Sequence, residues 1–303
     1  MALNHITFYS KLMEMEMGID VIIPENKWGY SLAERPKDYK YPVPWLLCGG
    51  GLDYTDWQRY TAIELYAAQA EGKLPTTSQP NPGYLENCMK QWKEAHYDAI
   101  IVLPIAAGLS GTYQGFRFAA ESLEMDEVHV IETRTLAAPL QDCACCAKKM
   151  AEANAPLETI LNVLAEKLDD TMTYAIPKDL VQLKRGGRIS PAAAAVAGLL
   201  KIKPLLKLAE DGSCVDKFGM ARTETKLFQM ICDDLKEHGV TPETHRLCIP
   251  HANSQEAAKR LAEAVRKQVG DFEISEMELP TVLGCHTGDG CLALQTIRKS
   301  EWD

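Results

Sequence analysis

A continuous apolar run at residues 98–105, DAIIVLPI, sets the tightest limit on the fold of this chain. It has the length of one strand and shows no polar alternation, which is typical of a parallel strand buried on both faces. Such a strand needs helices on each side of its sheet. The flanking amphipathic stretches at residues 83–95 and 112–123 predict two of them. The run therefore predicts an α/β fold with a parallel sheet.

This alternation of apolar and amphipathic blocks continues to about residue 170 and then changes character. The pattern predicts a strand over 128–132 and helices over 136–154 and 157–170. Beyond Asp169 and Asp170 the expected strands are shorter and more branched, which favours a mixed or antiparallel sheet. We expect strands at 171–176, 203–208, 214–220, 246–250, 272–278 and 291–298, and helices at 190–200, 223–238 and 254–269. Two domains, 1–170 and 171–303, follow.

Composition narrows the class of protein. With 303 residues the chain can form two domains, and clefts between domains are favoured ligand sites. A net charge of −10 argues against broad nucleic-acid binding. No apolar run is long enough for a transmembrane segment, and the first residues do not resemble a secretion signal, so we expect a cytoplasmic protein. A transient contact with a membrane surface stays open. The ten cysteines are expected to be reduced thiols.

Four segments combine glycine, hydroxyl and basic residues where strands give way to loops or helices. They are TTSQP at 76–80, GLSGTY at 108–113, LKRGGRI at 183–189 and GCHTGDG at 284–290. Hydroxyls and free backbone amides in the first two could bind an anion. The ordinary alternatives are a capped turn for the first segment, a solvated loop for the third and a structural histidine in the glycine-rich loop of the fourth.

In order and spacing these segments resemble the signature segments of the DegV family. The matching stretches are TSQP at 77–80, LSGTY at 109–113, LKRGGRI at 183–189 with IKP at 202–204, Arg222 with Thr223, and HTGDG at 286–290. The resemblance covers about residues 60–303. It implies a two-domain fold: an N-terminal α/β domain with a parallel sheet, a C-terminal α/β domain with a mixed or antiparallel sheet, and a long-chain fatty acid between them.

The resemblance also implies a carrier without catalytic residues, cofactor or ATP site, which presents the fatty-acid carboxylate to a separate ATP-dependent fatty-acid kinase. Matched residue by residue, it assigns the carboxylate to Thr77 and Ser110, with His286 and Arg222 nearby. The neighbouring head-group residues are Ser78, Gly111, Thr112, Thr287 and Gly288, and the kinase-facing surface is Lys184, Arg185 and Arg188. Burying roughly 14 methylenes at about 0.8 kcal/mol each would contribute about 11 kcal/mol, so the tail can drive binding.

Two departures from the family pattern concern the N-terminal part. Ala106 and Ala107 stand where the family usually has serines, and the Thr-Asp-Ser motif of its first strand is missing. Residues 1–66 instead resemble the start of a tributyrin-esterase-type α/β hydrolase, which makes a carboxylesterase the alternative function. That enzyme needs a G-x-S-x-G nucleophile elbow. No serine here has glycine two residues before it and two residues after it: Ser110 has Gly108 two before it but Thr112 two after it, so the alternative is disfavoured.

A metal site is a third possibility for the sequence. Cys143, Cys145 and Cys146 could act with His251 or His286. The three cysteines fall within a predicted helix and their spacing does not repeat elsewhere as a second C-x-x-C pair, so packing is the commoner role. We therefore expect no metal.

Overall fold

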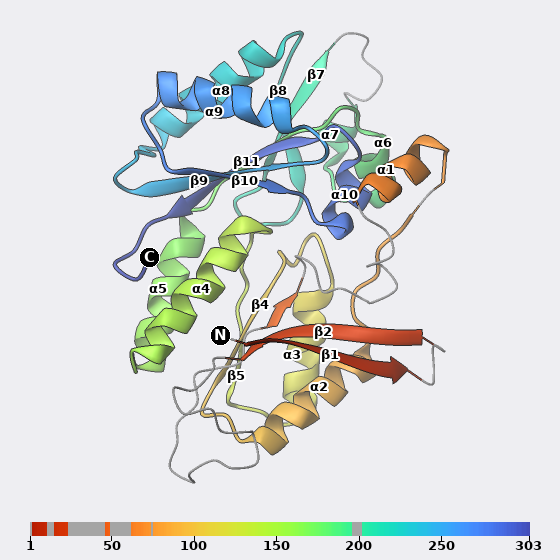
Figure 1. Cartoon of the computed structure of the whole chain (residues 1–303), viewed down its shortest axis with the longest axis vertical. Coiled ribbons are helices and arrows are strands. Elements are labelled where there is room, and N and C mark those ends of the chain that lie inside the picture. Colours follow the sequence, from red (N-terminus) through yellow and green to blue (C-terminus); the bar gives the residue numbers. More distant parts are fainter. Residues whose placement is uncertain (1, 11–14, 24–45, 49–61, 74, 196–201) are drawn as a thin grey trace.

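The structure is a computed structural model of the 303-residue chain, and it describes residues 2–10, 15–23, 46–48, 62–73, 75–195 and 202–303. Two sheets organise it (Figure 1). A three-stranded sheet lies in the lower half of Figure 1 and a six-stranded sheet in the upper half. A separate antiparallel hairpin is formed by β1 (Ala2–Ser10) and β2 (Met15–Ile23).

The small sheet is parallel, as the sequence predicts. Its order is β3 (Leu46–Cys48), β4 (Ile100–Pro104) and β5 (Val128–Val130). All five residues of β4 are buried. Ile100 and Val102 pack in one core cluster with α2 (Pro82–Ala95) and α3 (Thr112–Ser122). Ile101 and Leu103 pack in another with α4 (Ala138–Glu152) and α5 (Leu157–Asp169). The unbroken apolar run is thus explained by helices on both faces.

The large sheet is mixed, which confirms the expectation for the C-terminal part. Its order is β10 (Ile274–Glu278), β9 (His245–His251), β11 (Leu292–Arg298), β6 (Thr173–Ile176), β7 (Lys203–Leu208) and β8 (Val215–Ala221). Among the described strands of this sheet, β9 and β10 are the one parallel pair. Apolar side chains of α8 (Glu224–Glu237) and α9 (Gln255–Gln268) pack onto this sheet in the largest core cluster.

Gln295 on β11 joins the large sheet to the segment that enters α4. Its side chain is 1% exposed. Its Oε1 accepts a hydrogen bond from the Ala138 amide at 3.1 Å, and its Nε2 donates to the Leu136 carbonyl at 2.8 Å and to Thr173 Oγ1 at 3.0 Å. Between these two backbone partners Ala137 has φ 57° and ψ −121°, a conformation that favours glycine. Gln295 therefore holds a strained turn in place.

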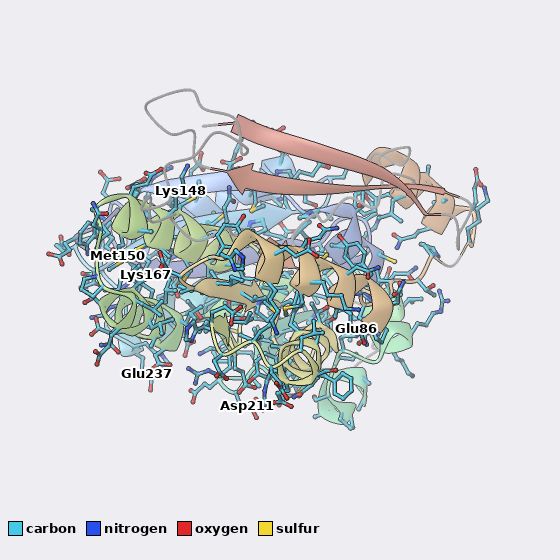
Figure 2. The ribbon with its side chains drawn as sticks, turned by 90° about the horizontal axis from the view of Figure 1, so that it is seen from below. Glu86, Lys148, Met150, Lys167, Asp211 and Glu237 are labelled. Carbon is cyan, nitrogen blue, oxygen red and sulfur yellow. The ribbon has the colours of Figure 1, made fainter. Side chains whose placement is uncertain are left out.

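A buried ion network fixes α4 and α5 against the end of the chain. The side chain of Lys167 on α5 is 2% exposed, and its Nζ lies 3.0 Å from Asp142 Oδ2 and 2.9 Å from Asp303 Oδ1. Arg246 on β9 also pairs with both carboxylates. Figure 2 labels Lys167 on α5 and, on the neighbouring α4, Lys148. Two cations and two carboxylates balance here, as buried charges require.

Two short helices correct the sequence interpretation. Residues of the LKRGG segment form α6 (Val181–Gly186) rather than a solvated loop, and Gly187, at φ 68°, caps its end in the left-handed conformation. The first residues of the GCHTGDG segment form the end of α10 (Thr281–Thr287) rather than a loop. Gly284 lies inside this helix because a Cβ there would come within 2.5 Å of Tyr66 Oη. Close packing, and not loop conformation, requires that glycine.

Two further short helices lie near the sequence segments. α1 (Ala62–Ala70) precedes the TTSQP segment. α7 (Pro191–Ala195) is the described part of the helix expected over 190–200, and residues 196–200 lie outside the described residues. The domain boundary near residue 170 coincides with the connection between α5 and β6, and the division stays a prediction. No helix among the described residues is both long and apolar enough to span a membrane.

Candidate functional site

Two of the sequence segments meet at the end of α10. Thr77 Oγ1 in the TTSQP segment lies 2.6 Å from His286 Nε2, although 209 residues separate them in the chain. Both side chains are half-buried, whereas Ser78 is exposed. A hydroxyl and an imidazole at this separation form one hydrogen-bonding unit whose donor depends on the histidine tautomer. The pairing brings together two residues that the family resemblance assigns to one carboxylate.

The surroundings of His286 keep its ring neutral. A Cβ at Gly186, the last residue of α6, would lie 2.6 Å from His286 Nδ1, so α6 packs directly against the ring. Burial, and then the positive charge of Arg188, lower the pKa of His286 below its ordinary value. At neutral pH the imidazole therefore offers one donor and one acceptor, and the fixed positive charge beside it belongs to Arg188.

Arg188 also ties the third segment to the second. Its Nε donates to the Leu109 carbonyl at 3.2 Å, and its guanidinium donates to the Gly186 carbonyl. Lys184 and Arg185 are exposed, and Arg185 Nη1 reaches only Gln182 Oε1, at 3.4 Å, among the described residues. The three cations of the LKRGGRI segment thus differ: two face solvent, and one is built into the fold.

The GLSGTY segment forms the start of α3. Ser110 Oγ lies 2.8 Å from Thr112 Oγ1 and accepts a hydrogen bond from the Thr112 amide at 3.3 Å. Gly111 is the N-cap residue, and a Cβ there would overlap the Gln79 amide, whose Oε1 would be only 1.8 Å away. Gln79 therefore covers Gly111 and brings the TTSQP segment against the start of α3. Gln79 is a site residue that the sequence interpretation did not single out.

A shallow pocket opens beside this contact. It has a volume of about 340 Å³ and lies between α2 and α3. Its lining residues are Gln79, Pro82, Glu86, Gly111, Gln114, Gly115, Phe118 and Ala119. Figure 2 labels Glu86 on α2 at this side of the molecule. Two of the lining residues, Gln79 and Gly111, come from the segments that carry Thr77 and Ser110.

Arg222 lies in different surroundings from the other three carboxylate candidates. It is exposed and precedes Thr223, whose Oγ1 caps α8 by accepting a hydrogen bond from the Lys226 amide. Within the described part of the chain, no hydrogen bond or ion pair connects Arg222 to Thr77, Ser110 or His286. Its part in binding a carboxylate stays a prediction.

Thr287 and Gly288 end α10. The Thr287 hydroxyl is buried beside the thiol of Cys291. Gly288, with φ 73°, caps the helix, and this backbone conformation favours glycine. Burial raises the pKa of Cys291 to about 12, so its thiol stays protonated at neutral pH. These residues shape the turn after His286.

An apolar cluster that we call the seam lies behind the polar residues and joins the two halves of the molecule. It draws side chains from α1, the loop after β4, the loop before α4, α10 and the ends of large-sheet strands. Its buried members are Leu65, Tyr66, Ile105, Ala106, Leu109, Ala137, Leu208, Ala252, Leu279, Leu283, Cys285 and Cys291. Because α10 contributes to the seam and also carries His286, polar and apolar surfaces adjoin there.

The candidate metal ligands do not gather into a site. Cys143 and Cys146 are free, buried thiols in α4 that pack against the small sheet. Among the residues that the structure describes, no three histidine, cysteine or acidic side chains are grouped to hold a metal ion.

The comparisons with known proteins agree with this arrangement. A family model described as "Uncharacterised protein, DegV family" matches residues 43–299. A DegV domain-containing protein of Halalkalibacterium halodurans is 31% identical over 253 residues, which cover 83% of this chain and 89% of the relative.

Solved structures of the same family have the same fold. A fatty-acid-binding DegV family protein from Streptococcus agalactiae has 26% identity and a TM-score of 0.73, with 80% of this chain and 85% of that chain covered. A DegV family protein from Thermus thermophilus, described as binding fatty acid, has 28% identity and a TM-score of 0.72 over 80% and 86% of the two chains. From its sequence and its fold, this chain belongs to the DegV family.

Proposed function

We propose that this chain binds one long-chain fatty acid along the seam and holds its carboxylate near Thr77, Ser110 and His286. The observation that carries the proposal is the contact between Thr77 and His286 at the edge of the seam. Hydroxyl and imidazole donors can replace the hydrogen bonds that a carboxylate loses on leaving water. Arg188 adds a positive charge next to His286, while its own guanidinium is held by the Leu109 carbonyl. The fatty-acid-binding relatives support the same ligand class.

The finer part of the proposal is that the bound acid is presented to a separate ATP-dependent fatty-acid kinase. In this scheme the chain supplies no catalytic group, and α6 carries the exposed cations Lys184 and Arg185 next to the head-group residues. Gly186 at the end of the same helix contacts His286. A partner that docks on α6 would therefore meet the carboxylate at close range.

The first test is the identity of any bound molecule. Native mass spectrometry followed by denaturing extraction is expected to release a long-chain fatty acid in a one-to-one ratio with the protein. The double variant Thr77→Ala with Ser110→Ala should bind that acid at least about tenfold more weakly, which corresponds to about 1.4 kcal/mol. A control that removes the same two residue types elsewhere is Thr241→Ala with Ser275→Ala. Equal affinity of the two double variants would remove Thr77 and Ser110 from the site.

A second test separates lipid binding from kinase docking. Arg185→Ala should leave fatty-acid affinity unchanged and slow phosphorylation of the bound acid by the kinase, because the guanidinium is exposed and bonds only Gln182 among the described residues. The exposed Lys217 on β8 provides the control, Lys217→Ala, which should slow nothing. Loss of lipid binding in Arg185→Ala would contradict its assignment to the partner surface.

A further inference from the structure

Helix α1 buries two polar groups at the seam that have no partner. Tyr66 is 5% exposed, and its hydroxyl oxygen has no hydrogen-bond partner among the described residues. Gln69 lies one turn further along α1, and its buried Oε1 also has no hydrogen-bond partner among the described residues. A buried polar atom without a partner destabilises the fold, so such atoms call for a physical explanation.

The orientation of the Gln69 amide is fixed by its neighbours. Its Nε2 donates to the Cys285 carbonyl at 3.1 Å and to the Gly284 carbonyl at 3.5 Å, both on α10. A flipped amide would place its oxygen against these carbonyl oxygens, so the observed orientation is required. The unpaired Oε1 is therefore a hydrogen-bond acceptor. Tyr66 contributes a donor, because burial raises the pKa of its phenol and keeps it protonated.

This donor and acceptor lie on a different side of α10 from the proposed carboxylate site. Tyr66 packs on Gly284, whereas Gly186 packs on His286. Gly284 and His286 are two positions apart on α10, so their side-chain directions differ by about 200° around the helix axis. One carboxylate therefore does not serve both places. A carboxylate also cannot donate to Gln69 Oε1, whereas a hydroxyl can accept from Tyr66 and donate to Gln69.

We infer that Tyr66 and Gln69 form a second polar subsite along the fatty-acid path and that it selects an acyl chain carrying a hydroxyl group. The inference rests on the proposed function, because it places the acyl chain in the seam to which Tyr66 belongs. It deepens that function by naming the ligand class as hydroxy fatty acids. The hydroxyl would bridge the phenol and the amide oxygen, which are not bonded to one another.

The test compares octadecanoic acid with its monohydroxy derivatives, the hydroxyl being moved along the chain. Competition measured by native mass spectrometry on the full-length, delipidated protein should find at least one derivative bound about tenfold more tightly than octadecanoic acid. Tyr66→Phe should abolish that preference, measured as the ratio of the affinities of the hydroxy acid and octadecanoic acid within the variant. Because this variant removes only an unpartnered oxygen, its melting temperature should not fall, which excludes misfolding as the cause. Gln69→Met should also reduce the preference.

The outcomes separate the two proposals. If octadecanoic acid binds but no hydroxylated derivative is preferred, or if the preference survives in Tyr66→Phe, the hydroxyl subsite is wrong while the carrier proposal stands. If none of the acids binds to the wild-type protein, the carrier proposal itself fails, and the subsite fails with it.

Discussion

Replacing Lys167 with alanine is expected to lower the free energy of unfolding by about 3–5 kcal/mol, as found when one partner of a buried ion pair is removed. The ammonium lies between Asp142 and Asp303 and donates to the Arg298 carbonyl at 2.6 Å. Burial alone would lower the pKa of Lys167, but the hydrogen bonds and charges of the two carboxylates outweigh burial and raise it. Without the ammonium, Arg246 is the one remaining cation in the described part of the chain that pairs with both carboxylates.

Lys148 offers a matched control for this variant. It lies on the neighbouring helix α4 with a side chain only 9% exposed, but the side chain of its partner Glu152, 3.7 Å away, is 48% exposed. The loss of the ion pair in Lys148→Ala should therefore lower the free energy of unfolding by about 1 kcal/mol or less, in addition to the lost packing of the aliphatic part of the side chain. Urea unfolding of the three proteins gives the comparison. A loss below about 1 kcal/mol in Lys167→Ala would show that the network does not stabilise the fold.

The second large effect is expected at Gln295. Gln295→Leu conserves the side-chain size but leaves the Ala138 amide and the Leu136 carbonyl without their partner in a buried place. At about 1–3 kcal/mol for each buried group, the loss in unfolding free energy should be about 3 kcal/mol. Gln229→Leu is the control, because the half-buried Gln229 makes one solvent-exposed hydrogen bond among the described residues, to Asp233, and the variant should change stability by about 0.5 kcal/mol or less.

A second substitution tests why Gln295 matters. If it stabilises the strained turn, Ala137→Gly should partly rescue Gln295→Leu, because glycine adopts a φ near 57° without the penalty that alanine has. Thermal or urea unfolding of the single and double variants measures the coupling. Equal destabilisation by Gln295→Leu and Gln229→Leu would contradict this role.

The sequence predicted the elements whose signal is local. The strand at 98–105 was recognisable because four successive residues, Ile100 to Leu103, are apolar, as burial on both faces requires. Their side chains alternate between two core clusters. The helices α8 and α9 follow from their amphipathic spacing. The short helices α6 and α10 were missed because their glycines suggested loops. The need for Gly284 comes from Tyr66, which is more than 200 residues away in the chain.

The site shows the same division. The contact between Thr77 and His286 was expected only through the family resemblance, because no spacing rule connects residues so far apart. The three cations at 184, 185 and 188 look alike in the sequence, and only the fold separates the half-buried Arg188, which bonds the Leu109 carbonyl, from the two exposed ones. Tyr66 and Gln69 gave no signal, since a spacing of three residues on a helix is equally typical of ordinary packing.

The paired glycines at the end of α6 place unequal limits on how this chain can change over generations. Gly187 needs its left-handed backbone, but the space around it is open, so asparagine is an accessible replacement during sequence drift. Gly186 has an ordinary helical backbone and no room, because any Cβ there displaces the ring of His286. Lineages that keep the histidine in its present place are therefore confined to glycine at 186, whereas position 187 also accepts asparagine.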